Sequence, residues 1–395
     1  MIASLFTILY IVYIVLGVLF YDLHYCSYID EIYPWLLLSV LLFSRRKFSK
    51  PLAVWLCIAL FYLLYSFAIA SNTNEAILSD FIAETKPYTA FLTLLCLRPR
   101  LSRRQLNLLK RFCLLCIPIL IVAGITNFGK VGTERFTLLP GARLGSACAI
   151  LALSYYLFAN KDSKKTMITC LLICAIGFAV PTSKHIILTG FIFFLFFSTR
   201  HHRLRFGVLA LILCTWVATT IYDSVINDFA IYYQSEGSAR GELFKASWYI
   251  LNDYFPFGSG LATYANAASA NWYSPLYGKY GLDSVYGLVE GNTLFASDTY
   301  IPVLAQFGWF GVIMFIVFIR FIYKKAKAYY RYSRDVKSYK IALTALAYIF
   351  IESMADASII GNRGVAVMMI LALSLYNIRI NEGIADKQFP LPERR

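Results

Sequence analysis

The chain has 395 residues, 59% of them hydrophobic, and its mean hydropathy is strongly positive. A soluble core of this size does not carry so many long apolar runs, so the composition excludes a soluble globular protein and indicates a polytopic membrane protein. The net charge of +15 alone would suit a nucleic-acid partner, but the positions of the basic residues decide that question.

Apolar segments long enough to cross about 30 Å of hydrocarbon recur along the chain. They predict twelve transmembrane helices, at about 2–20, 29–43, 51–70, 77–97, 106–125, 141–159, 166–182, 185–199, 205–222, 298–322, 339–356 and 365–380. No basic stretch precedes the first segment and no small-residue cleavage site follows it, so we expect a retained span rather than a signal peptide.

The basic residues alternate between loops as the positive-inside rule predicts. Of the 37 lysines and arginines, 28 lie at 45–50, 98–111, 161–165, 200–205, 320–340 and 379–395. The opposite side carries only nine basic residues but most of the acidic ones. This asymmetry predicts that both termini are cytoplasmic, and it removes nucleic acid as a partner.

The predicted organisation has four parts. Residues 1–222 form transmembrane helices one to nine, and 223–297 form the large outer loop. Residues 298–380 form helices ten to twelve, and 381–395 form a cytoplasmic tail. The cysteines show no spacing typical of a disulfide framework or a zinc site, so no metal is predicted.

The nine outer basic residues are the informative ones because topology does not explain them. They are Lys86, Lys130, Arg135, Arg143, Lys184, Arg240, Lys245, Lys279 and Arg363. A cation at membrane depth is costly, so each is either paired, with Glu84 beside Lys86 as one example, or placed for function. A convergence of Lys86, Arg143, Lys184 and Arg240 would suit a lipid-linked mono- or diphosphate.

The outer loop contains one predicted amphipathic helix. Ser238 is its expected N-cap, Arg240 and Glu242 lie in its first turn, and it ends near Asn252 before a Pro-Gly turn. Tyrosines and tryptophans, among them Tyr264 and Trp272, are frequent in the loop. Such residues suit a membrane interface as well as the faces of sugar rings, so both interpretations stay open.

Asp298 stands where the tenth predicted span leaves the outer surface. The residue fits a helix N-cap. It also fits an acceptor for the proton of an attacking sugar hydroxyl. The sequence does not choose between these roles.

Two local patterns carry a family resemblance. The pattern Arg-x-x-x-Leu, followed by Asp-x-Pro-φ-Gly-x-Gly, stands at 240–244 and 252–260, with Phe244 in place of leucine. A Ser-Lys pair at Lys184 replaces the family's Ser-Arg turn, and further basic positions match Lys86, Arg135 and Arg143. With twelve spans and one large loop between spans nine and ten, most of the chain resembles the O-antigen polymerase/O-antigen ligase superfamily.

The resemblance implies a bacterial inner-membrane glycosyltransferase with GT-C-like architecture. Its substrate would be an undecaprenyl-diphosphate-linked oligosaccharide, used at the periplasmic face without a cofactor. Arg240 would stabilise the leaving diphosphate, and Asp298, or else Glu242, would act as the base. Substrate binding would fall to Lys86, Arg135, Arg143, Lys184, Tyr264 and Trp272.

The family's ligases carry a histidine where this chain has Asp298, which favours a polymerase over a ligase acting on lipid A-core or protein. A lipid-linked oligosaccharide flippase is the alternative of another class, although such transporters tend to show internal repeats and short outer loops. A chain-length regulator and a flippase are candidate protein partners, beside the lipid bilayer itself.

Overall fold

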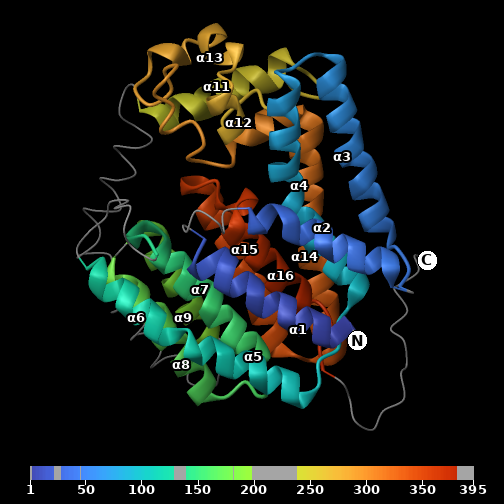
Figure 1. Ribbon diagram of the computed structural model, residues 1–395, viewed down its shortest axis with the longest axis vertical. Coiled ribbons are helices and arrows are strands. Elements are labelled where there is room, and N and C mark those ends of the chain that lie inside the picture. Colours follow the sequence, from blue (N-terminus) through green and yellow to red (C-terminus); the bar gives the residue numbers. More distant parts are fainter. Residues whose placement is uncertain are drawn as a thin grey trace.

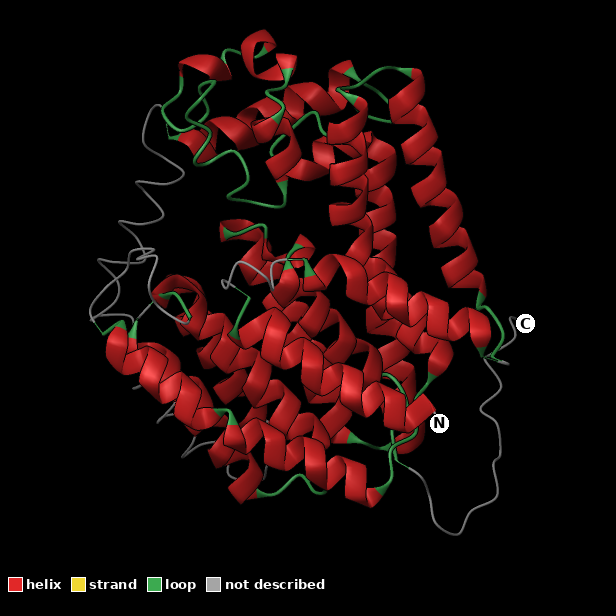
Figure 2. Cartoon of the chain, in the orientation of Figure 1, coloured by secondary structure: helices red, strands yellow, loops and turns green. Residues whose placement is uncertain are grey.

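The computed structural model describes residues 2–21, 28–44, 46–128, 139–180, 182–197 and 238–379. Within these ranges every regular element is a helix (Figures 1 and 2). The predicted all-helical fold class is therefore confirmed for the part of the chain that is described.

The helices before the outer loop are α1 Ile2–Val12, η1 Tyr13–Leu19, α2 Ile29–Phe43, α3 Lys50–Ala68, α4 Asn74–Leu97, α5 Arg103–Leu115, α6 Ile117–Thr126, α7 Gly141–Phe158, α8 Lys164–Ile176, η2 Gly177–Ala179 and α9 Ser183–Phe197. The loop holds α11 Ala239–Asp253, α12 Ala267–Asn271, α13 Pro275–Lys279 and η4 Leu282–Ser284. After it come η5 Pro302–Phe307, α14 Gly308–Ser333, α15 Val336–Ala355, η6 Ser358–Ile360 and α16 Asn362–Ser374. Each predicted span overlaps helical residues, except 205–222, which lies outside the described residues.

Among the described residues, four helical stretches are long and apolar enough to cross a membrane. They are Ile2–Leu19, Lys50–Ala68, Arg103–Thr126 and Pro302–Ser333. Shorter apolar helices occur at Arg143–Phe158, Ser183–Phe196 and Asn362–Ser374. These helices are consistent with a multi-pass membrane protein.

Side-chain caps set several helix starts. Ser49, Thr73 and Ser102 each accept a hydrogen bond from the backbone N–H three residues later, which satisfies one of the free donors of a first turn. Ser238 does the same for Gly241, so the predicted N-cap of the loop helix is confirmed. That helix ends at Asp253, one residue beyond the predicted end.

The predicted start of the tenth span, at residue 298, is wrong. The first helical turn begins at Pro302, whose ring favours the first position of a helix. The main helix α14 begins only at Gly308, whose φ of 61° separates it from η5. Asp298 therefore lies in the preceding loop, and its interpretation as a helix N-cap is wrong because Ile301 holds that position.

The segment predicted at 106–125 lies within the apolar helical stretch Arg103–Thr126, in which α5 and α6 meet at Cys116. Helix α5 ends at Leu115, because Pro118 lies in the first turn of α6 and cannot donate a backbone hydrogen bond to the preceding turn. The last span is shorter than predicted and ends at Ser374 instead of 380.

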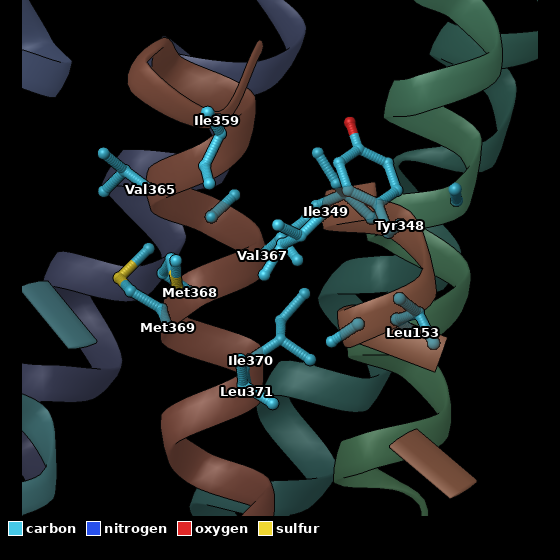
Figure 3. Packing of buried hydrophobic residues seen from close by; sticks show 14 of the residues in the cluster. Leu153, Tyr348, Ile349, Ile359, Val365, Val367, Met368, Met369, Ile370 and Leu371 are labelled. Carbon is cyan, nitrogen blue, oxygen red and sulfur yellow. The ribbon is translucent and has the colours of Figure 1, made fainter. Parts of the chain in front are cut away.

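Helix α16 forms the centre of the bundle. Each of its residues is buried, and it contacts α4, α7 and α15. In Figure 3, Val367 lies beside Ile349 of α15, while Met369 points to the other side of α16. A helix that is apolar on all sides belongs in the interior, so α16 fixes the positions of the helices around it.

The described part of the predicted loop, residues 238–297, lies at one end of α4 and α14 (Figure 1). Asp80 of α4 accepts hydrogen bonds from the backbone N–H of Ala262 at 2.7 Å and from the Gln306 amide at 3.0 Å. Gly258 and Gly308 meet backbone to backbone, since a Cβ on Gly258 would lie 2.3 Å from the Gly308 nitrogen. The loop thus has a fixed position over the helices that follow it.

Candidate functional site

Three basic residues stand at the second position of three different helices. They are Lys184 in α9, Arg240 in α11 and Arg363 in α16. A helix N-terminus carries partial positive charge, so a cation there costs roughly 0.3–1 kcal/mol unless something compensates. The side chains are only 15, 14 and 9% exposed, so water does not compensate this charge.

Carboxylates from the end of α15 compensate two of these cations. The Lys184 Nζ lies 2.8 Å from Asp356 Oδ2 and 3.0 Å from Glu352 Oε2. Arg363 Nη2 lies 2.9 Å from the same oxygen of Asp356. Ser146 of α7 donates to Glu352 Oε1 at 3.0 Å, which anchors this carboxylate to a third helix.

The third cation, Arg240, pairs with Asp298. Its Nε donates to Asp298 Oδ2 at 2.9 Å, and its Nη2 donates to the same oxygen. Burial raises the pKa of Asp298 above its ordinary value, while the charge of Arg240 acts in the opposite direction. Asp298 is two residues from Tyr300, whose backbone N–H donates to the carbonyl of Ser353, the residue after Glu352, so the two sets of ion pairs lie near each other.

We call these six residues the ion cluster: Lys184, Arg240, Asp298, Glu352, Asp356 and Arg363. Three helix N-termini and three basic side chains meet around three carboxylates in it. Helix N-termini and basic side chains are the groups with which proteins bind phosphate. The cluster therefore has the chemistry of an anion site whose cations are paired with the chain's own acids.

The segment 298–300 joins the ion cluster to helices α4 and α15. The Tyr300 backbone N–H donates to the Ser353 carbonyl of α15 at 3.0 Å. The Tyr300 hydroxyl donates to Glu84 of α4 at 3.2 Å and also bonds the Tyr88 hydroxyl at 2.9 Å. Tyr300 thereby fixes the backbone that carries Asp298 against both α4 and α15.

A cavity of about 600 Å³ lies on the other side of Tyr300, between α3, α4 and α14. Its walls are mostly apolar and include Trp55, Phe315 and Phe318, whereas Glu84 and Tyr300 add polar groups. Such a volume is typical of ligand-binding pockets. Because Asp298 is two residues from Tyr300, its backbone lies within roughly 7 Å of the cavity wall.

Two of the predicted phosphate-binding cations lie in different surroundings from Lys184 and Arg240. Lys86 is buried, and its Nζ lies 2.5 Å from Asp30 of α2, so the expected pairing with Glu84 is replaced by this one. Arg143 lies over the ring of Tyr21, with 5.6 Å to the centroid. It is also one helical turn from Ser146, so both share the face of α7 beside the ion cluster. Arg135 lies outside the described residues.

The three loop residues expected at the site, Glu242, Tyr264 and Trp272, differ in burial and in their contacts. Glu242 pairs with Lys245 at 2.6 Å on the outer face of α11. The ring of Tyr264 is fully buried, and its hydroxyl donates to the Leu243 carbonyl, so it offers no open face to a sugar. Trp272 is half-buried at the end of α12.

The sequence interpretation missed Glu352, Asp356 and Arg363 as members of the site. One signal for the two acids is available in the sequence, since both stand at one end of an otherwise apolar segment, where ionisable residues are rare. Arg363 was already among the unexplained outer cations. Its partner was not visible because the pairing depends on the turn between α15 and α16.

Among the described residues, no group of three or more His, Cys, Asp or Glu side chains is placed to hold a metal ion. A scan against protein-family models and a search of curated proteins found no match to this chain. The function is therefore inferred from the chain's own residues and their geometry.

Proposed function

We propose that this protein is a membrane glycosyltransferase that polymerises a surface polysaccharide such as O-antigen. In this proposal twelve helices cross the bacterial inner membrane in a GT-C-like arrangement. Both termini are cytoplasmic, and residues 223–297 form a periplasmic loop. The alternation of basic loops along the sequence supports this orientation.

One observation carries the proposal: the ion cluster and the apolar cavity share the segment 298–300. A cluster rich in buried cations suits a phosphate group, and the adjoining cavity suits a hydrocarbon chain. A lipid-linked phosphate has both chemical parts in one molecule. Undecaprenyl-diphosphate-linked oligosaccharide is therefore the proposed substrate.

In the proposed reaction, the hydroxyl of a new lipid-linked repeat unit attacks the anomeric carbon of the growing glycan. The new bond forms as the bond from that carbon to the diphosphate breaks, and the diphosphate leaves with the electron pair. Arg240, Lys184 and Arg143 stabilise its developing charge. Removal of one such group typically costs a factor of about 10²–10³ in rate.

The hydroxyl proton passes to a carboxylate in the same step. Asp298 is the first candidate, because it touches the cation that would hold the diphosphate. A raised pKa also makes this carboxyl a stronger base than an ordinary aspartate. Glu242 is the second candidate, but its partner Lys245 holds it on the outer face of α11.

Purified protein in lipid vesicles with lipid-linked oligosaccharide tests the proposal. We expect products several repeat units long, and we expect Arg240→Ala to abolish them while the protein still inserts and elutes as wild type. Lys279→Ala, which removes a loop cation that lies on tyrosine rings, is the matched control. Translocation of the substrate without any longer product would contradict the proposal and favour a flippase.

A further inference from the structure

The ion cluster carries no net charge in the resting protein. Lys184, Arg240 and Arg363 are balanced by Asp298, Glu352 and Asp356. A neutral cluster has little attraction for a highly charged diphosphate, because each carboxylate repels it at short range. An anion that binds here has to replace some of the acids around the cations.

The three carboxylates differ in how firmly they are held. The side chain of Glu352 is only 3% exposed, and the hydroxyls of Ser146 and Ser358 both donate to it. The side chains of Asp298 and Asp356 are 31 and 27% exposed. Glu352 is thus a fixed part of the wall, whereas the two aspartates reach the surface of the cluster.

The two aspartates are also bound by basic side chains rather than by neutral donors. In the described part of the chain, the Asp356 side chain accepts hydrogen bonds from Lys184 and Arg363, and that of Asp298 accepts them from Arg240. Lysine and arginine bind phosphate oxygens by the same charge-assisted hydrogen bonds. A phosphate at either position keeps each of these contacts.

The basic side chains of the ion cluster also have more hydrogen-bond donors than its carboxylates accept. The Nε of Arg363 is buried and, among the described residues, has no hydrogen-bond partner. The N-termini of α9 and α16 lie at Asp356 and that of α11 lies at Asp298, and each adds partial positive charge that favours an anion there. A ligand with more acceptor oxygens than two carboxylates would therefore be bound more strongly.

We propose that Asp298 and Asp356 occupy two phosphate subsites, one at Arg240 and the other at Lys184 and Arg363, until the two phosphates of a lipid diphosphate displace them. This inference rests on the proposed function, because it takes the ion cluster as the site of the lipid head group. It specifies a diphosphate, since a monophosphate replaces only one of the two carboxylates.

Displacement also prepares the reaction. Asp298 loses its ion pair with Arg240 when a phosphate takes that position. Its carboxylate then becomes available to the hydroxyl of the acceptor sugar, whose proton it receives as the glycosidic bond forms. The same exchange thus binds the donor and releases the base, so the base is not exposed before a donor is present.

The test measures binding of farnesyl diphosphate and farnesyl monophosphate to the full-length protein in detergent micelles. We expect Asp356→Asn and Asp298→Asn each to raise the affinity for the diphosphate at least tenfold, because a competing charge is gone. The gain for the monophosphate should be smaller. Asp356→Glu keeps the charge and should give no gain, and Asp283→Asn, at an exposed loop acid, controls for net charge.

Unchanged or weaker diphosphate binding by both asparagine variants, with a wild type that does bind, would overturn the inference and leave the proposed function standing. Absence of diphosphate binding by the wild type and all variants would overturn both. Asp298 makes no hydrogen bond to Glu352 or to its partners Ser146 and Ser358 among the described residues. If Asp356→Asn does not fold, diphosphate binding by Asp298→Asn alone therefore tests the inference.

Discussion

Several helices of this protein begin with basic residues, and these residues fall into an exposed group and a buried group. Arg103 and Arg104 begin α5, and Lys164 and Lys165 begin α8, and all four are exposed. The cations that open α9, α11 and α16 are mostly buried and lie against carboxylates. Residue type and helix position are alike in the two groups, so neither explains the difference.

If the proposed function holds, the contrast separates cations that orient the chain in the membrane from cations that bind the substrate. An exposed cation at a helix start is solvated, and its position follows the membrane-topology rule. A buried cation at the same position is unfavourable until an acid or a ligand neutralises it. The ion cluster contains three such residues, each neutralised by a carboxylate.

The largest expected effect concerns the carboxylate that holds the buried group together. Glu352→Ala removes the more deeply buried of the two carboxylates that pair with Lys184, together with two serine hydrogen bonds, so it should lower the free energy of unfolding by about 3–5 kcal/mol. Thermal unfolding in detergent measures the loss. Glu242→Ala, at an exposed pair, is the control and should change stability by less than about 1 kcal/mol.

Asp298→Asn should reduce polymerisation about 100-fold with little change in folding. The amide can still accept a hydrogen bond from Arg240, but it cannot take the hydroxyl proton. Turnover of lipid-linked substrate in vesicles measures the effect. Full chain length and an unchanged rate would show that Asp298 only positions Arg240.

The pH dependence of polymerisation should follow the ionisation of Asp298. Burial raises the pKa of Asp298, so activity should be complete above that pKa and lost as the pH falls through it, at a higher pH than for an ordinary aspartate. Arg240→Gln removes the charge that lowers this pKa and should move any residual acid limb upward. A limb that stays in place in Arg240→Gln would contradict the assignment.

The raised pKa of Asp298 also determines how this group's contribution to the free energy of unfolding changes with pH. The folded state holds the Asp298 proton more strongly than the unfolded state, so this group's contribution to stability decreases as the pH rises between the two pKa values. Comparison of wild type with Asp298→Asn by thermal unfolding across the acidic range isolates that contribution. The difference should shrink toward low pH, where both side chains are neutral.

The smallest effects are expected for the exposed helix-opening cations. Lys165→Ala and Arg104→Ala should each change the free energy of unfolding by no more than about 0.5 kcal/mol, because water solvates these charges. Polymerisation should stay at the wild-type rate. A large loss of activity in either variant would remove the distinction between the two groups of cations.

Local patterns predicted most of the helices and little of the ion cluster. Apolar length located the helices, and Ser238 marked the start of α11, because these signals lie within a few residues of the structure they specify. The prediction that a helix starts at Asp298 was wrong, because the first helical turn begins at Pro302 and the main helix begins at Gly308. The pairing of Lys184 with Asp356 joins residues 172 positions apart, so it depends on tertiary packing that no local pattern contains.

The order in which the ribosome delivers these helices has a consequence for biogenesis. Lys184 and Arg240 are synthesised before α15 brings Glu352 and Asp356, and α16 with Arg363 comes after both. Until then Lys184 lacks its acids, whereas Arg240 already has Asp298, and the bundle lacks its wholly buried central helix. The ion cluster is therefore completed only late in translation, and a nascent chain that stops before α16 lacks both the core and the charge arrangement on which the proposed catalysis would depend.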